Sequence, residues 1–375
     1  MDSIHPLRPI AVIEPEALLH FQPDQATATA RFLSLCGPQS ALHTWPIPAA
    51  GPDQQPLASH SLWWGPADAE QVLVMLSGTH GVEGLAGSAL QCDLLARLNS
   101  GAQTLAAGSA VLFVHLLNPW GAAWLRRCDQ DGIDLNRNFI DFGRALPDNP
   151  GYEALRNALL SRSDSLRGQV LARYRQCHGD AAYQIAISGG QYTDPQGPFH
   201  GGRRASTARS MLDQLVERYQ LSRRRLAVID LHTGLGAYGY GEIICDHPGG
   251  SAGLATALAW YGDAVTRAED GSSSSVPKTG LLDFYWQALM PPGSCFVTLE
   301  FGTFSTAQLF EVILADHRLH RAAPLTPALL THPVKLALRA HFYPQTRQWQ
   351  QLALFRTRQV TQLALDGLSG QTETP

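Results

Sequence analysis

The sequence lacks any apolar run of the ~20 residues that a membrane-spanning helix needs. Its first residues contain no basic segment followed by an apolar stretch and a small-residue cleavage site, so no secretory leader is expected. The six cysteines are scattered and form no CxxC pair, which argues against a disulfide framework and against a zinc site built from thiolates. These absences favour a protein of the reducing cytoplasm.

Charge of either sign is also scarce, since only 16% of the residues are charged. The formal net charge is -4 and no long run of like charge occurs, so neither a nucleic-acid groove nor an anionic-membrane surface is indicated. With 375 residues, 45% of them hydrophobic, the chain can bury a large core and is near the upper size of one domain. We therefore expect a single domain over residues 1–375 and a small molecule or peptide as its partner, with the oligomeric state left open.

Short apolar runs rich in Val, Ile and Leu recur between longer mixed segments, and this rhythm is typical of an α/β fold with a buried sheet. Strands are expected at residues 71–77, 110–117, 226–231, 241–245 and 295–299. Helical periodicity predicts helices at residues 85–98, 152–176, 206–219, 252–267, 326–341 and 346–365. We expect a mixed, mostly parallel sheet flanked by helices, with a catalytic core at about 71–303 and a C-terminal helical extension at about 326–365.

Clusters of Gly, Pro, Ser and Asp predict loops at residues 147–151, 188–198 and 269–277. They indicate loops rather than domain linkers, because regular patterns resume on both sides. The last one contains the serine run 272–275, which we expect to be a surface loop. Residues 271–277 could instead form a lid, because long loops often border active sites.

Two polar turns that follow expected strands could form a metal site. The strand at 71–77 runs into a glycine-rich turn with His80 and Glu83, three residues apart, and the strand at 226–231 ends at His232. Open α/β sheets bind ligands at the carboxyl ends of their strands. Two histidines and one glutamate suit a catalytic zinc ion, because a fourth position stays open for water. Each part also has a simpler explanation, since surface helices commonly carry such a pair and a lone histidine is more often structural.

A third strand end carries Glu300, which lies between apolar neighbours. A carboxylate in such a place is costly unless it has a role or a partner. Zinc-dependent hydrolysis needs a general base for the attacking water, and Glu300 is our candidate. A buried salt bridge to an arginine is the structural alternative.

The densest polar segment of the chain, residues 118–139, contains Arg126, Arg127, Asp134 and Arg137. Arginines bind carboxylates and stabilise developing oxyanions. Asp134 could accept a hydrogen bond from the non-coordinating nitrogen of a ligand histidine and so fix its tautomer. Taken alone, the segment could equally be a solvated charged loop.

The order of the motifs HxxE, NPxG, R…DLNRNF, DLH and TLEFG resembles the zinc carboxypeptidase superfamily, which includes aspartoacylase and succinylglutamate desuccinylase. The resemblance covers about residues 71–303, although the NPDG of the family is NPWG here. The stretches GQYTDPQG at 190–197 and HGG at 200–202 resemble the branch of that superfamily known as domain of unknown function 2817.

The resemblance implies a role for the residues at the strand ends. His80, Glu83 and His232 match the zinc ligands of the superfamily. Asp134 matches the aspartate that supports the first histidine, and Glu300 matches the catalytic glutamate. The resemblance therefore implies one zinc ion per chain, although sites with two histidines and one carboxylate also accept iron, manganese or cobalt.

The resemblance also implies a substrate-binding set. Asn136 and Arg137 match the pair that binds the terminal carboxylate of the substrate, and Arg127 matches the arginine that polarises the scissile carbonyl, with Arg126 as the competing choice. The mobile tyrosine that digestive carboxypeptidases bring over the substrate has no clear counterpart, and the candidates are Tyr192, Tyr238 and Tyr240. We expect the single histidines His115, His178 and His247 to be structural.

The implied activity is zinc-dependent hydrolysis of an amide bond in a substrate with a free carboxylate. The substrate is either a short peptide, cut by a carboxypeptidase, or an N-acyl amino acid, cut by a deacylase. The pair Asn136 and Arg137 favours the peptidase, whereas the missing tyrosine and the expected cytoplasmic location favour the deacylase. A non-catalytic carboxylate-binding protein on the same fold is the third alternative.

Overall fold

The computed structural model describes residues 13–370. The N-terminal segment in which no secretory leader is expected begins with residues 1–12, which lie outside the described residues. The centre of the fold is one eight-stranded sheet in the order β1-β2-β4-β3-β5-β8-β6-β7. Its strands are β1 (Ser40–Ala50), β2 (Pro56–Trp64), β3 (Gln71–Ser77), β4 (Ser109–His115), β5 (Arg225–Gly234), β6 (Gly241–Ile244), β7 (Val265–Thr266) and β8 (Cys295–Gly302). None of the helices in residues 13–370 has both the length and the apolar character that crossing a bilayer requires.

The four central strands β4, β3, β5 and β8 run parallel to one another. The strands β1 and β2 extend one edge of the sheet in antiparallel fashion, and β6 joins β8 antiparallel at the other side. The predicted single α/β domain with a mixed, mostly parallel sheet is therefore confirmed. Because parallel strands end at the same edge of a sheet, the turns after β3, β5 and β8 meet there.

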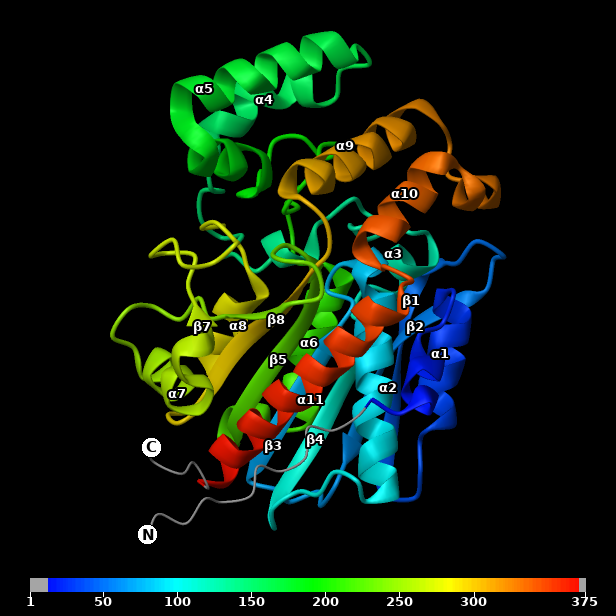
Figure 1. The fold of residues 1–375 in the computed structure, drawn as a ribbon, viewed down its shortest axis with the longest axis vertical. Helices are drawn as coiled ribbons and strands as arrows, with labels where there is room; N and C mark the ends of the chain where they lie inside the picture. The colour runs from blue at the N-terminus through cyan, green and yellow to red at the C-terminus, as the bar shows by residue number, and fades with distance from the viewer. Residues whose placement is uncertain (1–12, 371–375) are drawn as a thin grey trace.

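Helices cover both faces of the sheet (Figure 1). Alternation along β3 places Leu73 and Met75 in one core and Val72 and Val74 in the other. The first core is closed by α1 (Gln25–Ser34), α2 (Gly84–Ser100), α7 (Ala252–Tyr261) and α11 (Arg347–Ser369), and the second by α6 (Thr207–Arg218) and α8 (Leu282–Leu289). Full burial of each such side chain contributes about 1.5–3 kcal/mol, so the two cores hold the sheet rigid under the site.

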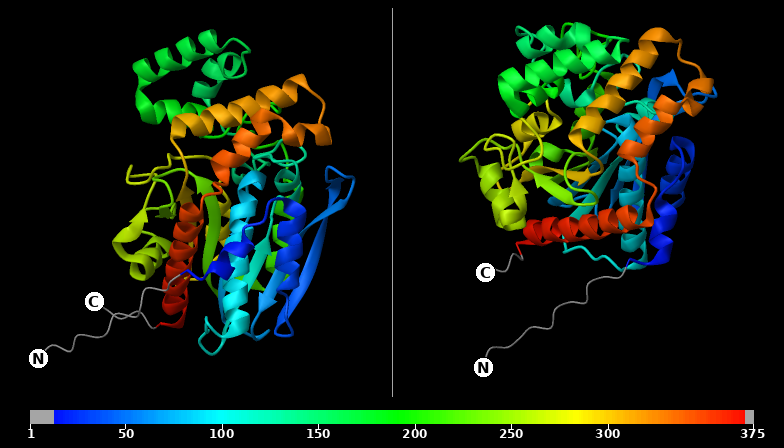
Figure 2. Two further views of the ribbon diagram at one scale, coloured as in Figure 1. Left: turned by 45° about the vertical axis from the view of Figure 1, so that its right-hand side comes forward. Right: turned by 45° about the horizontal axis from the view of Figure 1, so that its top comes forward.

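Four further helices gather at the end of the sheet where the central strands finish, and the turned views show the same arrangement (Figures 1 and 2). They are α4 (Pro150–Leu159), α5 (Asp164–Ser188), α9 (Thr306–Ala322) and α10 (Pro333–Phe342), and their apolar faces share a third core. The short helix α3 (Pro119–Ala123) and the 3₁₀ turns at Gly81–Glu83 and Leu135–Arg137 lie in the connections near this edge. The remaining 3₁₀ turns are Pro15–His20, Leu221–Arg223, Gly262–Ala264 and Pro327–Thr331.

Three of the predicted helices are wrong in extent. The helix expected at 326–341 is divided into the 3₁₀ turn Pro327–Thr331 and α10, which begins at Pro333. The helix expected at 152–176 is divided between α4 and α5, because the side chain of Ser163 accepts a hydrogen bond from the amide of Leu166 at 3.3 Å and starts a new helix. The helix expected at 252–267 ends at Tyr261, because Gly262 takes a φ of 62° and the chain then enters β7. The loop expected at 147–151 gives way to α4 at Pro150, which is the first position of that helix.

The strands β1, β2 and β7 and the helices α1, α3, α8 and α9 were not predicted. Pro46 and Pro48 lie within β1 and disguise it in the sequence, yet the sheet tolerates them because β1 is an edge strand. The start of α9 does carry a recognisable signal, since Ser305 and Gln308 form a reciprocal capping box.

Candidate metal centre

The turn that follows β3 is held in place by close backbone contacts. Gly78 turns the chain with a φ of 70°, which glycine adopts without strain. The backbone of Gly81 lies against that of Gly121 and leaves no room for a side chain at Gly81. The amide of Gly81 also donates to the carbonyl of Arg127 at 3.2 Å. These contacts fix His80 next to the segment that carries Arg127.

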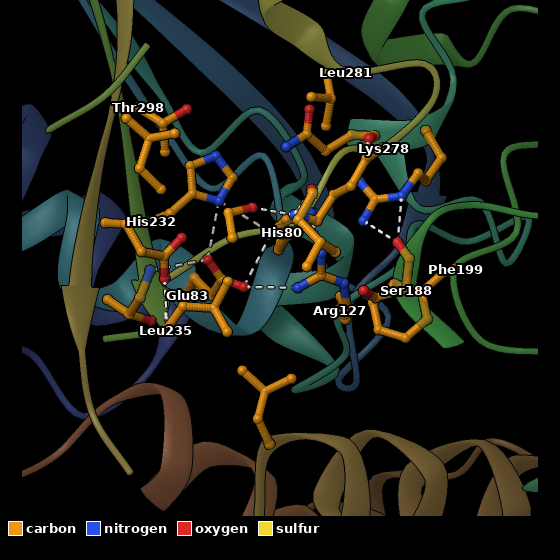
Figure 3. A pocket seen from close by; sticks show the side chains of 18 of the residues that line it. His80, Glu83, Arg127, Ser188, Phe199, His232, Leu235, Lys278, Leu281 and Thr298 are labelled. Atoms are coloured by element: carbon orange, nitrogen blue, oxygen red, sulfur yellow. Dashed lines mark hydrogen bonds and ion pairs between the residues drawn. The ribbon is translucent and has the colours of Figure 1, made fainter. Parts of the chain in front are cut away.

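The side chains of His80, Glu83 and His232 converge on one point (Figure 3). Nδ1 of His80 lies 3.0 Å from Oε1 of Glu83 and 3.2 Å from Nδ1 of His232. Nδ1 of His232 lies 3.2 Å from Oε2 of Glu83, and one potential ligand atom from each residue falls within 4.8 Å of the others. All three side chains are buried. The structure therefore brings together the three residues that the sequence singled out as a metal site.

The outer nitrogens of both imidazoles face carboxylates. Nε2 of His80 lies 3.0 Å from Oδ1 of Asp134, and Nε2 of His232 lies 2.6 Å from Oδ2 of Asp230. The hydroxyl of Thr79 donates to Asp230 at 2.9 Å. Each carboxylate favours a tautomer with the proton on Nε2, so both Nδ1 lone pairs point at the same place.

This donor set fits a divalent metal ion. Two unprotonated Nδ1 atoms 3.2 Å apart repel each other unless a cation or a proton lies between them. Burial opposes the charged form of His232, yet Asp230 raises the pKa of that imidazole well above its ordinary value. Burial also works against the charged form of Glu83, but His80 and His232 hold the pKa of that carboxyl well below its usual range. The site is therefore built to surround positive charge, and two imidazoles with one carboxylate form a suitable set for zinc.

Asp230, the aspartate of the DLH motif, is not among the site residues predicted from the sequence. The signal that would have found it is its spacing of two residues from His232 on a strand, which places both side chains on one face. Their contact gives His232 the same kind of carboxylate support that Asp134 gives His80.

Arg127 reaches the metal cluster from the loop before Asp134. Its Nε donates to Asp134 at 2.9 Å and its Nη1 donates to Glu83 at 3.1 Å, and these two carboxylates raise its pKa against the effect of burial. Its Nη2 lies 2.7 Å from Nε2 of His80, a contact in which that nitrogen would have to accept. If Nε2 of His80 accepted this hydrogen bond, the proton of the imidazole would lie on Nδ1, and Nδ1 could not bind a metal ion. Metal binding therefore requires Nε2 to carry the proton and to donate it to Asp134.

The competing arginine points elsewhere. Nε of Arg126 donates to Oδ2 of Asp316 on α9 at 3.1 Å, and Arg126 does not line the cavity beside the cluster. Only one of the two adjacent arginines therefore faces the cluster, and it is Arg127.

Glu300 lies beside the cluster on β8, directly opposite His232 in the strand register. Its Oε1 accepts a hydrogen bond from the amide of Leu235 at 2.9 Å, and it forms no ion pair with an arginine anywhere in the described chain. Burial, followed by the charge of Glu83, raises the pKa of Glu300 to about 7. A carboxyl group with such a pKa can both accept and release a proton near neutral pH.

A cavity extends from the cluster and is lined by Asn136 and Arg137 as well. The guanidinium of Arg137 donates to the carbonyl of Ser188 from Nε at 3.1 Å and from Nη2 at 2.6 Å. Burial lowers the pKa of Arg137 to about 10. The amide oxygen of Asn136 accepts from the backbone of Leu282 at 2.7 Å, which fixes the side chain at the cavity wall.

None of the three candidate tyrosines covers the cavity. Tyr192 is buried, and its hydroxyl donates to the backbone carbonyl of Arg137 at 2.7 Å. Tyr238 and Tyr240 are exposed, and no tyrosine of residues 13–370 lines the cavity.

The loop at 269–277 does reach the cavity, because Ser275 and Val276 form part of the wall. The same wall carries Lys278, which the sequence reasoning missed because a single loop lysine has no pattern to mark it.

A family model described as a protein of unknown function, DUF2817, matches residues 24–356. The chain belongs to the DUF2817 family. The match confirms the predicted membership of the DUF2817 branch. No curated protein matches this DUF2817 chain.

Several solved structures are similar to the DUF2817 chain. An aspartoacylase family protein from Mesorhizobium loti is 16% identical over 72% of this chain and 63% of that one, with a TM-score of 0.39, so the match spans less than two thirds of that protein. Carboxypeptidase A from Helicoverpa armigera is 13% identical over 92% of this chain and 71% of that one, with a TM-score of 0.44. Succinylglutamate desuccinylase from Chromobacterium violaceum is 16% identical over 87% of this chain and 75% of that one, with a TM-score of 0.36.

Proposed function

We propose that this protein is a zinc-dependent hydrolase that cleaves an amide bond in a substrate with a free carboxylate, acting as a metallocarboxypeptidase. The observation that carries the proposal is the convergence of His80, Glu83 and His232 at the wall of a cavity that also contains Glu300. A set of three protein ligands leaves a coordination position open, as a catalytic zinc site does and a structural site does not.

In this proposal the three ligands hold one zinc ion per chain. A zinc ion bound by these residues would supply a Lewis acid for the scissile carbonyl and for water. Asp134 and Asp230 hold the two imidazoles in the tautomer that leaves Nδ1 free, and so keep the ligand atoms in position.

Glu300 acts as the general base and then as the general acid. Its carboxyl group lies on the strand next to His232, and a pKa raised to about 7 suits a group that takes a proton from water and delivers it to the leaving amine. Arg127 stabilises the negative charge that develops on the carbonyl oxygen, because it is the cation that touches the ligand cluster.

The substrate carboxylate binds to Asn136 and Arg137. Arg137 is 1% exposed and its guanidinium makes hydrogen bonds to backbone carbonyls, so its positive charge is not compensated by an ion pair within the described chain. A buried charge without a counterion is costly, and a carboxylate from the substrate would remove that cost.

The second candidate is an N-acyl amino acid deacylase, which would use the same centre. The observation that favours it is an apolar part of the cavity wall, formed by Leu309, Phe310 and Phe342, which could accommodate a short acyl chain. The two activities differ only in the group on the carbonyl side of the scissile amide bond, which is a peptide for the carboxypeptidase and a short acyl chain for the deacylase.

The test is hydrolysis of a panel of short peptides and N-acyl amino acids by the wild type and by Glu300→Gln. The amide oxygen of the new side chain can still accept from Leu235, so the local structure should persist. We expect release of the C-terminal or deacylated amino acid by the wild type and a loss of about 10²–10⁴-fold in the variant.

The control is Glu217→Gln, which makes the same chemical change at an exposed position of α6. Full activity in Glu300→Gln would refute the assignment of the base. A wild type that holds its metal and binds carboxylates but hydrolyses no member of the panel would favour the non-catalytic binding protein instead.

A further inference from the structure

Three cations line the cavity, and two of them form no ion pair with any carboxylate of residues 13–370. One is Arg137, which donates only to the carbonyls of Ser188 and Asn136. The other is Lys278, whose ammonium group donates to the carbonyl of Val276 at 2.9 Å and to the hydroxyl of Ser275. Buried positive charge of this kind is destabilising unless an anion is supplied from elsewhere.

The surroundings of Lys278 compensate its charge only in part. Burial lowers its pKa to about 7, and the next largest cause of the lowering is the neighbouring charge of Arg137. The two cations therefore face one region of the cavity and repel each other. An ammonium group has three donors, and the contacts with Val276 and Ser275 use two of them, which leaves one for a ligand.

Two acidic residues also line this end of the cavity, and the charge of Asp246 offsets part of the charge of Lys278. Neither Asp246 nor Asp283 forms an ion pair with Lys278 in the described part of the chain. Burial, and then the charge of Asp246, raises the pKa of Asp283 to about 8, so at neutral pH its carboxyl group is mostly protonated and can donate a hydrogen bond. The wall around them is apolar and includes Ile244, Leu281 and Phe296.

We propose that Lys278 is a specificity-determining residue that binds a second carboxylate of the substrate, so that the preferred substrates end in glutamate or aspartate. Arg137 then binds the α-carboxylate and Lys278 the side-chain carboxylate of the same residue. A single carboxylate shared by both would leave one of these buried cations without an ion pair, whereas an acidic residue offers a partner to each. The inference rests on the proposed function and adds the substrate class to it.

The experiment compares kcat/KM for two N-acetyl dipeptides that are identical except for a C-terminal glutamate or glutamine. The zinc-loaded wild type should prefer the glutamate substrate by at least about tenfold. In Lys278→Met, which keeps the length of the side chain and removes its charge, the ratio of the two kcat/KM values should fall by about 10- to 100-fold, as expected for the loss of a hydrogen bond between charged groups. Lys278→Arg should keep a preference for glutamate.

The matched control is Arg267→Met, because Arg267 is a cation near the start of the same loop but pairs with Glu269 and Asp270 and does not line the cavity. The ratio in this variant should equal that of the wild type. The proposal is overturned if the wild type does not discriminate between the two substrates, or if Lys278→Met lowers both values equally. A preference for C-terminal lysine or arginine would also overturn it and would assign the selection to Asp246 and Asp283.

A binding measurement separates this inference from the proposed function. Calorimetry on zinc-loaded Glu300→Gln should show tighter binding of L-glutamate than of L-glutamine, and the additional Lys278→Met change should abolish the difference. If no amide substrate is cleaved and this difference is still found, the proposed function fails and the site for two carboxylates stands. If substrates are cleaved but the difference is absent, the proposed function stands and the present inference fails.

Discussion

The carboxylate of Asp230 offers a sharp test of how the metal ligands are held. It lies 2.6 Å from Nε2 of His232, is buried and accepts a further hydrogen bond from Thr79. Replacement by asparagine preserves the shape of the side chain, and its amide oxygen can still accept from either partner. The change therefore removes one negative charge and little else.

The expected magnitude follows from that geometry. A short hydrogen bond to a charged acceptor is roughly twice as strong as a neutral one, and carboxylates that support ligand histidines typically contribute 10- to 100-fold to metal affinity. We expect Asp230→Asn to weaken zinc binding by about 10- to 100-fold, which corresponds to about 1.4–2.7 kcal/mol. The assay is competition for zinc with a chromogenic chelator at fixed pH.

The control for this measurement is Asp263→Asn, at an exposed position away from the cavity, which should bind zinc as the wild type does. Circular dichroism should show that both variants are folded. A zinc affinity in Asp230→Asn within about twofold of the wild type would refute the argument that this carboxylate strengthens the metal centre.

Two further predictions concern stability. Nε2 of His247 accepts from the amide of Phe296 at 3.0 Å, and burial lowers the pKa of His247 from 6.5 to about 4. This neutral ring should contribute about 3 kcal/mol to the free energy of unfolding above pH 6.5, and this contribution is lost as the pH falls toward 4. Urea unfolding at pH 7 and near pH 4 should therefore show a smaller loss of stability in His247→Gln than in the wild type. Asp316→Ala should cost about 3–5 kcal/mol by urea unfolding at pH 7, because it removes the partner of both Lys335 (2.6 Å) and Arg126 (3.1 Å); an unchanged midpoint would contradict this.

The sequence allowed the central part of the fold to be predicted because its strands are buried on both faces. Such strands are continuous apolar runs, and the polar residue that ends each run stands out, as His232 and Glu300 do. In a parallel arrangement those ends meet, so His80 and Glu83 could be expected near His232 from the sequence alone.

Other features depend on contacts that no local pattern reveals. The strand β1 was hidden by its two prolines, which only its edge position makes tolerable. The choice between Arg126 and Arg127 required the position of Asp316, which lies on a helix that was not predicted. Lys278 belongs to a loop without periodicity, and its position in the cavity follows from how that loop folds against the rest of the wall.

The metal content of the purified protein tests the central claim most directly. Elemental analysis of the wild type beside His80→Ala, with circular dichroism to show that both are folded, should find about one zinc ion per chain in the wild type and none in the variant. The absence of tightly bound metal from the wild type, or an equal amount in His80→Ala, would contradict the proposal that His80, Glu83 and His232 form a catalytic metal centre.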